Sequence, residues 1–220
     1  EKLPQLGLLE VSLQEADVVV TSPGIPPSQF PKTDKEIISE IEFSFRLLKA
    51  QAKVPILVGV TGTNGKSTVS ALTAHILQVP VCGNFGIPLI HFVGQSHDAL
   101  VVELSSYQLE TCTTFAPDVA VILNLTEDHM ERHKSMKEYG NQKAKIFQSQ
   151  TLDQTLIYFE DDPLVLDLVK PARSHKIPFS LRSPEAIWEK DVSVFGEHNQ
   201  LNMAASILAA RACGLSDGTI

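Results

Sequence analysis

The stretch VPILVGVTGTNGKSTV, residues 54–69, decides the fold class of this chain. Its first half is almost continuously apolar, which predicts a strand buried on both faces. The glycine-rich turn that follows leads into a helix expected over 65–78, with an apolar stripe along one side. A turn of this kind directs backbone N–H groups toward one point beside the positive end of the helix. The stretch therefore predicts a phosphate-binding loop, although Val60 stands where the usual pattern has its first glycine.

The loop predicts a nucleotide site made by consecutive residues: Gly62, Thr63, Asn64, Gly65, Lys66, Ser67 and Thr68. Lys66 supplies a mobile cation for the outer phosphates, and the Ser67 hydroxyl is suited to bind Mg²⁺. Guanine-specific proteins usually carry Asn-Lys-x-Asp after a strand, but the comparable NLTED at 124–128 lacks the lysine. We therefore predict ATP and Mg²⁺ as cofactors. The loop alone leaves open whether the γ-phosphate passes to water, to a protein partner or to a substrate.

Strand and helix patterns alternate along the rest of the chain, which is typical of a parallel sheet with helices on both faces. Further strands are expected at 100–104, 119–124 and 155–159, and helices at 134–150 and 199–213. The fold class is therefore α/β, with a P-loop mononucleotide-binding sheet.

A smaller unit precedes this sheet. The strand ADVVVT at 16–21 ends in the turn SPGIP, expected to be type II, and a connecting helix is expected over 40–53. Few residues join this strand to the next apolar run, barely enough for a helical crossover. We place a boundary near residue 50, between part of a Rossmann-like α/β domain (1–50) and the central domain (51–220).

Composition argues against several classes of partner. Lys and Arg number 18 against 26 Asp and Glu, with a net charge of −8 and no basic run, which disfavours nucleic acid. The longest apolar runs are far too short to span a membrane, and the first residues do not read as a signal peptide. Three cysteines lie far apart without a CxxC pair, as in a reduced protein. We expect a cytoplasmic monomer.

Polar residues follow two of the predicted strands. Glu103 ends one strand and is followed by two serines and a glutamine, a concentration that suggests a ligand surface at the carboxyl edge of the sheet. His129 follows the next strand and is expected at the same edge. His133 forms an HxxxH pair with it, but no third zinc ligand is evident, so we expect His133 to be a solvated loop residue.

Four motifs in order, TGTNGKST, ELSSYQLE, NLTEDHMERH and GEHNQLNMAAS, resemble the central ATP-binding domain of the Mur ligase family. The ELSSYQLE form most resembles the branch that joins D-glutamate to UDP-N-acetylmuramoyl-L-alanine in peptidoglycan precursor synthesis. The resemblance implies that the γ-phosphate goes to the substrate's carboxylate and forms an acyl phosphate, which the amine of the amino acid then attacks. It also implies a third, amino-acid-binding domain, which we expect to be absent from this chain.

The resemblance implies roles for individual residues. Lys66 would bind the β- and γ-phosphates, Ser67 and Glu103 would serve the nucleotide Mg²⁺, and His129 would serve a second Mg²⁺. The family also uses a carbamylated lysine as a metal ligand. Lys143 and Lys145 compete for that role, and we choose Lys143 for its spacing to Tyr139; composition alone would put both lysines on a solvated helix face.

The resemblance also implies contacts with the nucleotide and the nucleotide sugar. Asn199 and Asn202 would contact adenine, although Asn199 also suits a helix cap. The substrate contacts would be Gly24 in SPGI, Asn84 in CGNFG, and Ser105 and Gln108 in ELSSYQLE.

Two alternatives stay open. A sister Mur ligase or a folylpolyglutamate synthase would perform the same chemistry on another carboxylate. A nucleotide-switch ATPase would instead use hydrolysis to exchange a partner, although no switch-like DxxG motif is visible.

Overall fold

A six-stranded parallel sheet forms the centre of the molecule. The computed structural model describes residues 13–30, 32–186 and 196–216. In sheet order the strands are β4 (Val81–Gly83), β5 (Ala99–Glu103), β3 (Ile56–Thr61), β6 (Val119–Ile122), β7 (Thr155–Phe159) and β8 (His175–Phe179). The strand order reverses beside β3, and open parallel sheets bind ligands at such a point. The expected α/β fold is confirmed.

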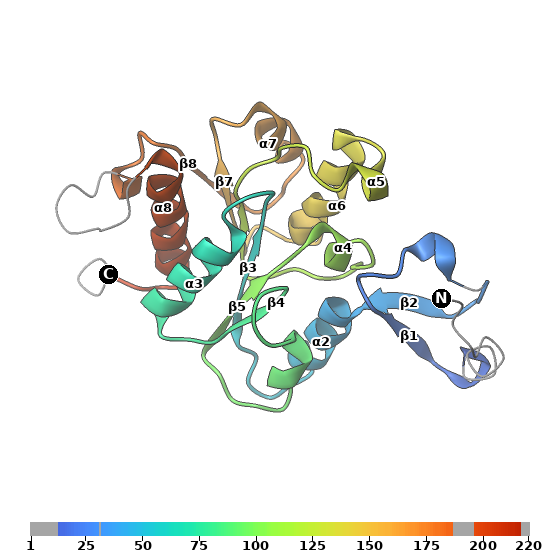
Figure 1. Ribbon diagram of the computed structural model, residues 1–220. Helices are drawn as coiled ribbons and strands as arrows, with labels where there is room; N and C mark the ends of the chain where they lie inside the picture. The colour runs from blue at the N-terminus through green and yellow to red at the C-terminus, as the bar shows by residue number, and fades with distance from the viewer. Residues whose placement is uncertain (1–12, 31, 187–195, 217–220) are drawn as a thin grey trace.

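Helices cover both faces of this sheet (Figure 1). One face carries α3 (Lys66–Leu77) and α8 (Glu197–Ala212); the other carries α2 (Glu40–Lys49), α4 (Ser106–Leu109), α6 (Met136–Gln148) and α7 (Pro163–Leu168). Neighbouring residues of β3 divide between the two cores: Leu57 packs in the core with α2 and α6, and Val58 in the core with α3 and α8. Because both faces are buried, the strands read as continuous apolar runs.

A two-stranded sheet precedes the central one. β1 (Val18–Thr21) pairs in parallel with β2 (Glu36–Ser39), and the connection contains only the short 3₁₀ helix η1 (Pro27–Gln29). This short connection replaces the full crossover helix for which the sequence leaves too few residues. Residues 1–12 of the predicted N-terminal domain lie outside the described residues.

The turn after β1 differs from its prediction. Ile25 N donates to Ser22 O at 3.0 Å, so a turn forms where SPGIP predicts one. A type II turn requires positive φ at its third residue, and Gly24 is not among the residues with positive φ. The type II assignment is therefore wrong.

Helix α2 joins the two sheets through a buried carboxylate. Glu42 is fully buried and accepts hydrogen bonds from the backbone amides of residues 113–115 and from Arg46 Nε. Arg46 also makes two bonds to Glu36 of β2, at 2.7 and 2.8 Å. Burial raises the pKa of the Glu42 carboxyl, but hydrogen bonds from the Thr114 hydroxyl, from Arg46 and from the backbone outweigh burial and lower that pKa below its ordinary value. The charge is thus well compensated, and β2, α2 and the loop after α4 are held together.

Two helix ends depend on residues with positive φ other than glycine. The helix expected over 65–78 ends at Gln78, with φ 56°, and this lets the chain enter β4 without a glycine. The helix expected over 134–150 is α6, which begins later because Lys134 has φ 57°. A separate single turn, α5 (Met130–His133), precedes it. The remaining short elements are η2 (Leu89–Phe92) and η3 (Pro184–Ala186).

Candidate active site

The loop between β3 and α3 has a backbone that requires glycine. Gly62 and Gly65 have φ of 153° and 86°, a region that other residues rarely adopt. A Cβ on Gly65 would lie 2.5 Å from Asn202 Oδ1. A Cβ on Gly62 would lie 2.9 Å from Cβ of Leu123, which follows β6. Both the conformation and the lack of space therefore exclude a side chain at these two positions.

Cationic, hydroxyl and amide groups converge at this loop. Lys66 Nζ donates to Thr63 O at 2.8 Å, so the lysine folds back over the loop. Ser67 and Thr68 lie exposed in the first turn of α3, and Gly65 at its N-cap provides no side-chain cap. An uncapped helix start carries positive partial charge and free N–H donors. The arrangement is suited to bind an anionic phosphate group.

Glu103 lies beside the loop because β5 pairs with β3, and this pairing puts Glu103 opposite Val60. Its side chain is buried, and Oε1 accepts a hydrogen bond from Asn84 Nδ2 at 2.6 Å. The other carboxylate oxygen, Oε2, is also buried and has no hydrogen-bond partner among the residues that the structure describes. An unpaired buried carboxylate oxygen is costly unless a cation or donor approaches it. The residues present therefore fit a Mg²⁺ ion carried by the nucleotide.

Ser105 and Gln108 bond to each other at the start of α4. Ser105 Oγ accepts from Gln108 N at 3.2 Å, and Gln108 Oε1 accepts from Ser105 N at 3.0 Å, which together form a capping box. Gln108 is buried and Ser105 is half-buried. These two predicted substrate contacts thus have a definite local role, which is to fix the turn that follows Glu103.

His129 has an unusual backbone and a partly exposed ring. Its φ is 56°, and its side chain is 43% exposed. Its ring nitrogens lie 3.4 Å from Asp128 Oδ2 and 3.6 Å from Glu131 Oε1, and its ring lies 4.9 Å from that of Tyr107. A ring held between acidic groups and still open to solvent is available to a ligand.

Lys143 lies under the phosphate loop. Its side chain is buried, and Nζ donates to Gly62 O at 2.8 Å. Burial, with a smaller contribution from the nearby Lys66 charge, lowers the pKa of its ammonium to about 7. Lys145 instead donates to Glu110 O, away from the loop. The expectation of a solvated lysine is therefore wrong for Lys143, because this face of α6 packs against the sheet.

His133 corrects a second expectation of solvent exposure. It is fully buried, and Nε2 lies 2.9 Å from Ser106 Oγ. Its ring lies between Tyr107 and Tyr139, with centroids 5.5 and 5.3 Å away. Burial lowers the pKa of its imidazole. The sequence does not reveal this burial, because α5 is too short to show an apolar period.

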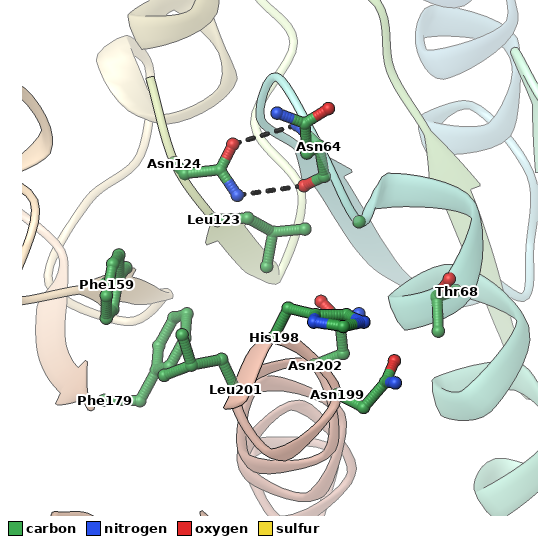
Figure 2. A pocket seen from close by; sticks show the side chains of 11 residues that line it. Asn64, Thr68, Leu123, Asn124, Phe159, Phe179, His198, Asn199, Leu201 and Asn202 are labelled. Atoms are coloured by element: carbon green, nitrogen blue, oxygen red, sulfur yellow. Dashed lines mark hydrogen bonds between the residues drawn. The ribbon is translucent and has the colours of Figure 1, made fainter. Parts of the chain in front are cut away.

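A cavity of about 390 Å³ opens beside the loop (Figure 2). Asn64 N and O are bonded to the side chain of Asn124, at 2.9 and 3.0 Å, and this pair forms one wall. The other lining residues are Gly65, Thr68, Leu123, Phe159, Phe179, His198, Asn199, Leu201 and Asn202. α8 begins at Glu197 with Gly196 as its N-cap, so Asn199 lies inside the first turn rather than at the cap. The predicted pair Asn199 and Asn202 is thus brought to the phosphate loop.

Six of the lining residues were not predicted as site residues: Leu123, Asn124, Phe159, Phe179, His198 and Leu201. Phe159 and Phe179 end neighbouring strands, and their rings lie 5.6 Å apart. Phe159 could have been predicted from its position at the carboxyl edge of the sheet, and His198 from its place next to Asn199. The cavity offers apolar walls with a few amides, as a planar heterocycle requires.

Two of the predicted substrate contacts, Gly24 in the SPGIP turn and Asn84, are exposed on the surface. Gly24 is exposed, and the next residue in the turn, Ile25, accepts a bond from Arg132 of α5 at 3.4 Å. Asn84 is exposed next to the carboxyl end of β5.

In the described ranges, no group of three or more His, Cys, Asp or Glu side chains is arranged to hold a metal.

A glycine-rich loop between a central parallel strand and a helix, with a lysine and hydroxyls at the helix start, defines a P-loop nucleotide-binding protein. Residues 60–195 match the Mur ligase middle domain. The chain belongs to the Mur ligase family.

Two curated relatives agree with this assignment, and a solved structure shares the fold. UDP-N-acetylmuramoylalanine--D-glutamate ligase of Thermoanaerobacter sp. (strain X514) is 34% identical over 241 residues, covering 94% of this chain and 52% of that protein. The enzyme of the same name from Citrifermentans bemidjiense is 41% identical over 177 residues, covering 75% and 38%. The MurF ligase from Thermotoga maritima in complex with ADP aligns with a TM-score of 0.63 at 17% identity, covering 95% and 57%. The chain spans about half the length of the curated relatives it matches.

No helix in the described part of the chain has the length and apolar character needed to cross a membrane.

Proposed function

We propose that this protein is an ATP-dependent ligase that joins D-glutamate to UDP-N-acetylmuramoyl-L-alanine through an acyl phosphate. The observation that carries the proposal is Lys143, a buried amine bonded to the carbonyl of Gly62 at the base of the phosphate loop. A P-loop needs no second buried lysine to bind a nucleotide. An amine there with a lowered pKa is suited to become a carbamate beside the transferred phosphate.

The reaction answers a chemical need. A carboxylate is a poor electrophile, so its oxygen attacks the γ-phosphorus of ATP, the bond to the β-phosphate oxygen breaks, and ADP leaves. The amine of D-glutamate attacks the acyl carbon, loses a proton, and expels inorganic phosphate as the amide forms. In this scheme Lys66, with the amides of the loop, neutralises charge on the phosphates and holds them in line.

Mg²⁺ would be held by Ser67 and Glu103 on the nucleotide side, and by His129 and carbamylated Lys143 on the acceptor side. When bound, Mg²⁺ withdraws charge from phosphate oxygens. Glu103 Oε2 supports this assignment, because it is buried and has no hydrogen-bond partner among the described residues. Asn84 keeps the other oxygen of that carboxylate occupied and so orients it.

Lys143 is suited to react with CO₂. A lysine becomes a nucleophile only when neutral, and a pKa of about 7 leaves a large neutral fraction near neutral pH. Its nitrogen attacks the carbon of CO₂ and releases a proton, giving an anionic carbamate. The new negative charge would lie near Lys66, whose charge helps to lower the pKa of Lys143.

Contacts with the substrates follow from the same geometry. Asn199 and Asn202 would contact adenine in the cavity beside the loop. Gly24, Asn84 and Ser105 would contact the nucleotide sugar, with Gln108 holding Ser105 in place. We propose that the protein works in the cytoplasm as a monomer, in two units divided near residue 50.

The alternatives are less well supported. Relatives more than 30% identical carry the D-glutamate ligase name, whereas other Mur ligases and folate-type ligases match in fold at lower identity. A nucleotide switch gives no reason for a buried lysine under the loop.

The test is phosphate release from ATP, measured with UDP-N-acetylmuramoyl-L-alanine and each of several amino acids. We expect release to require both the nucleotide sugar and D-glutamate. Dependence on L-alanine or a diamino acid would move the protein to a sister enzyme. Steady release without any carboxylate substrate would contradict the ligase proposal.

A further inference from the structure

His133 has no role in the reaction proposed above. It ends the single-turn helix α5, four residues after His129, and no part of it is exposed. Nε2 lies 2.9 Å from Ser106 Oγ, and Nδ1 is buried without a hydrogen-bond partner among the described residues. A fully buried imidazole with one nitrogen bonded is a specific contact rather than a solvated loop residue.

The ring contacts segments that carry groups proposed above to hold Mg²⁺. Ser106 begins α4, directly after the turn that follows Glu103. Tyr107, next to it, contacts the rings of both His129 and His133. His133 is therefore the buried link between the ELSS segment and the segment of His129.

On its other side the ring reaches the phosphate loop. His133 packs on Tyr139 of α6, with centroids 5.3 Å apart, and Tyr139 Oη lies 3.2 Å from Thr63 Oγ1. Lys143 lies one turn further along α6, with Nζ 4.5 Å from the Tyr139 ring centroid. One imidazole thus contacts neighbours of Glu103, His129 and Lys143 at once.

Segment α5 depends on such contacts because its backbone gives it little stability. A single helical turn has few internal hydrogen bonds, and residues with φ of 56° and 57°, His129 and Lys134, flank this one. Both are strained conformations for residues with side chains. Arg132 holds the outer side through Glu110 and the face of Tyr107, while His133 holds the inner side.

We propose that His133 is a positioning residue that fixes His129 against the phosphate loop, so that the acceptor carboxylate meets the γ-phosphate in line. The proposal rests on the proposed ligase function for its catalytic consequence. Its structural content, that the His133–Ser106 bond sets the position of the His129 ring, stands apart from that function.

The test compares variants that separate the hydrogen bond from the ring. His133→Phe keeps an aromatic ring between the two tyrosines and loses the bond; Ser106→Ala removes the bond from the other side; His133→Gln restores a donor. His175→Phe, at an exposed histidine of β8, is the control. Thermal unfolding identifies variants that fail to fold. If His133→Phe fails to fold, Ser106→Ala, which is the smallest change, still tests the loss of the hydrogen bond.

We expect His133→Phe and Ser106→Ala to raise KM for the nucleotide sugar, or lower kcat, by about tenfold, the value of one neutral hydrogen bond. KM for ATP should change by less than about twofold, because one bond outside the nucleotide cavity is lost. His133→Gln should recover part of the loss. Unchanged kinetics in both variants, or equal losses for ATP and sugar that follow the melting temperature, would overturn the proposal.

An NMR measurement separates this proposal from the ligase function. In protein labelled at histidine, the His129 ring signal is assigned by its loss in His129→Gln. We expect His133→Phe and Ser106→Ala to shift that signal, and His175→Phe to leave it in place. A shift in a protein without ligase activity would keep the positioning role and reject the function. An unmoved His129 signal would reject the positioning role whatever the activity.

Discussion

Replacing Lys143 with methionine should stabilise the protein in a way that depends on pH. The folded state lowers the pKa of this buried amine from 10.5 to about 7, so it holds the charged form less well than the unfolded chain does. At about 1.4 kcal/mol per pKa unit, the cost approaches ~5 kcal/mol below pH 7, where both states are protonated. The cost shrinks as the pH rises from 7 toward 10.5 and is absent above that range.

Methionine has similar length and no charge, so Lys143→Met removes this cost and also loses the bond to Gly62 O. The lost bond changes little with pH. The difference in free energy of unfolding between variant and wild type should therefore fall by about 2–3 kcal/mol between pH 6 and pH 9.

Urea unfolding at several pH values, without nucleotide and in CO₂-free buffer, measures this difference directly. Lys137→Met is the control, since Lys137 is exposed on the same helix, and its difference from wild type should stay constant. A Lys143→Met difference that is the same at pH 6 and pH 9 would refute the argument that the buried amine has a lowered pKa.

Four further predictions concern the site and its frame. Lys66→Ala should lower phosphate transfer at least about 100-fold by removing a charge that neutralises the phosphates, and steady-state kinetics would show whether turnover survives. Gly65→Ala should weaken ADP binding at least about tenfold in calorimetry, because its Cβ would clash with Asn202 Oδ1; unchanged affinity would contradict the loop geometry. Lys143→Ala should lose activity and regain part of it with small carboxylates, and no rescue would count against the carbamate. Glu42→Gln should lower the free energy of unfolding by about 2–4 kcal/mol in urea, because its amide would face backbone N–H donors.

The parts of the fold that the sequence predicted are those with a strong local pattern. The apolar run ending in GTNGKS predicted β3, the loop and α3, because a strand buried on both faces is almost continuously apolar. Glu103 at the end of β5 was expected beside the loop because parallel strands end at one edge, and it lies opposite Val60.

Burial of single polar side chains was not predictable in this way. His133 is buried between α4 and α6, and Lys143 is buried beneath the phosphate loop; both are tertiary arrangements with no sequence period. Spacing favoured Lys143 over Lys145, but only the structure shows its bond to Gly62 O. The phenylalanines of the cavity come from strand ends far apart in sequence, so topology alone brings them together.

The central claim is that the γ-phosphate passes to the substrate's carboxylate. Transfer of an oxygen isotope tests it most directly. UDP-N-acetylmuramoyl-L-alanine labelled with ¹⁸O in its carboxylate reacts with ATP and D-glutamate. The ¹⁸O content of the released phosphate is then measured by mass spectrometry. We predict that each released phosphate carries one ¹⁸O atom, taken from the carboxylate when the acyl phosphate breaks down. Phosphate that contains no label from the carboxylate would show that ATP is hydrolysed by water and would contradict the account.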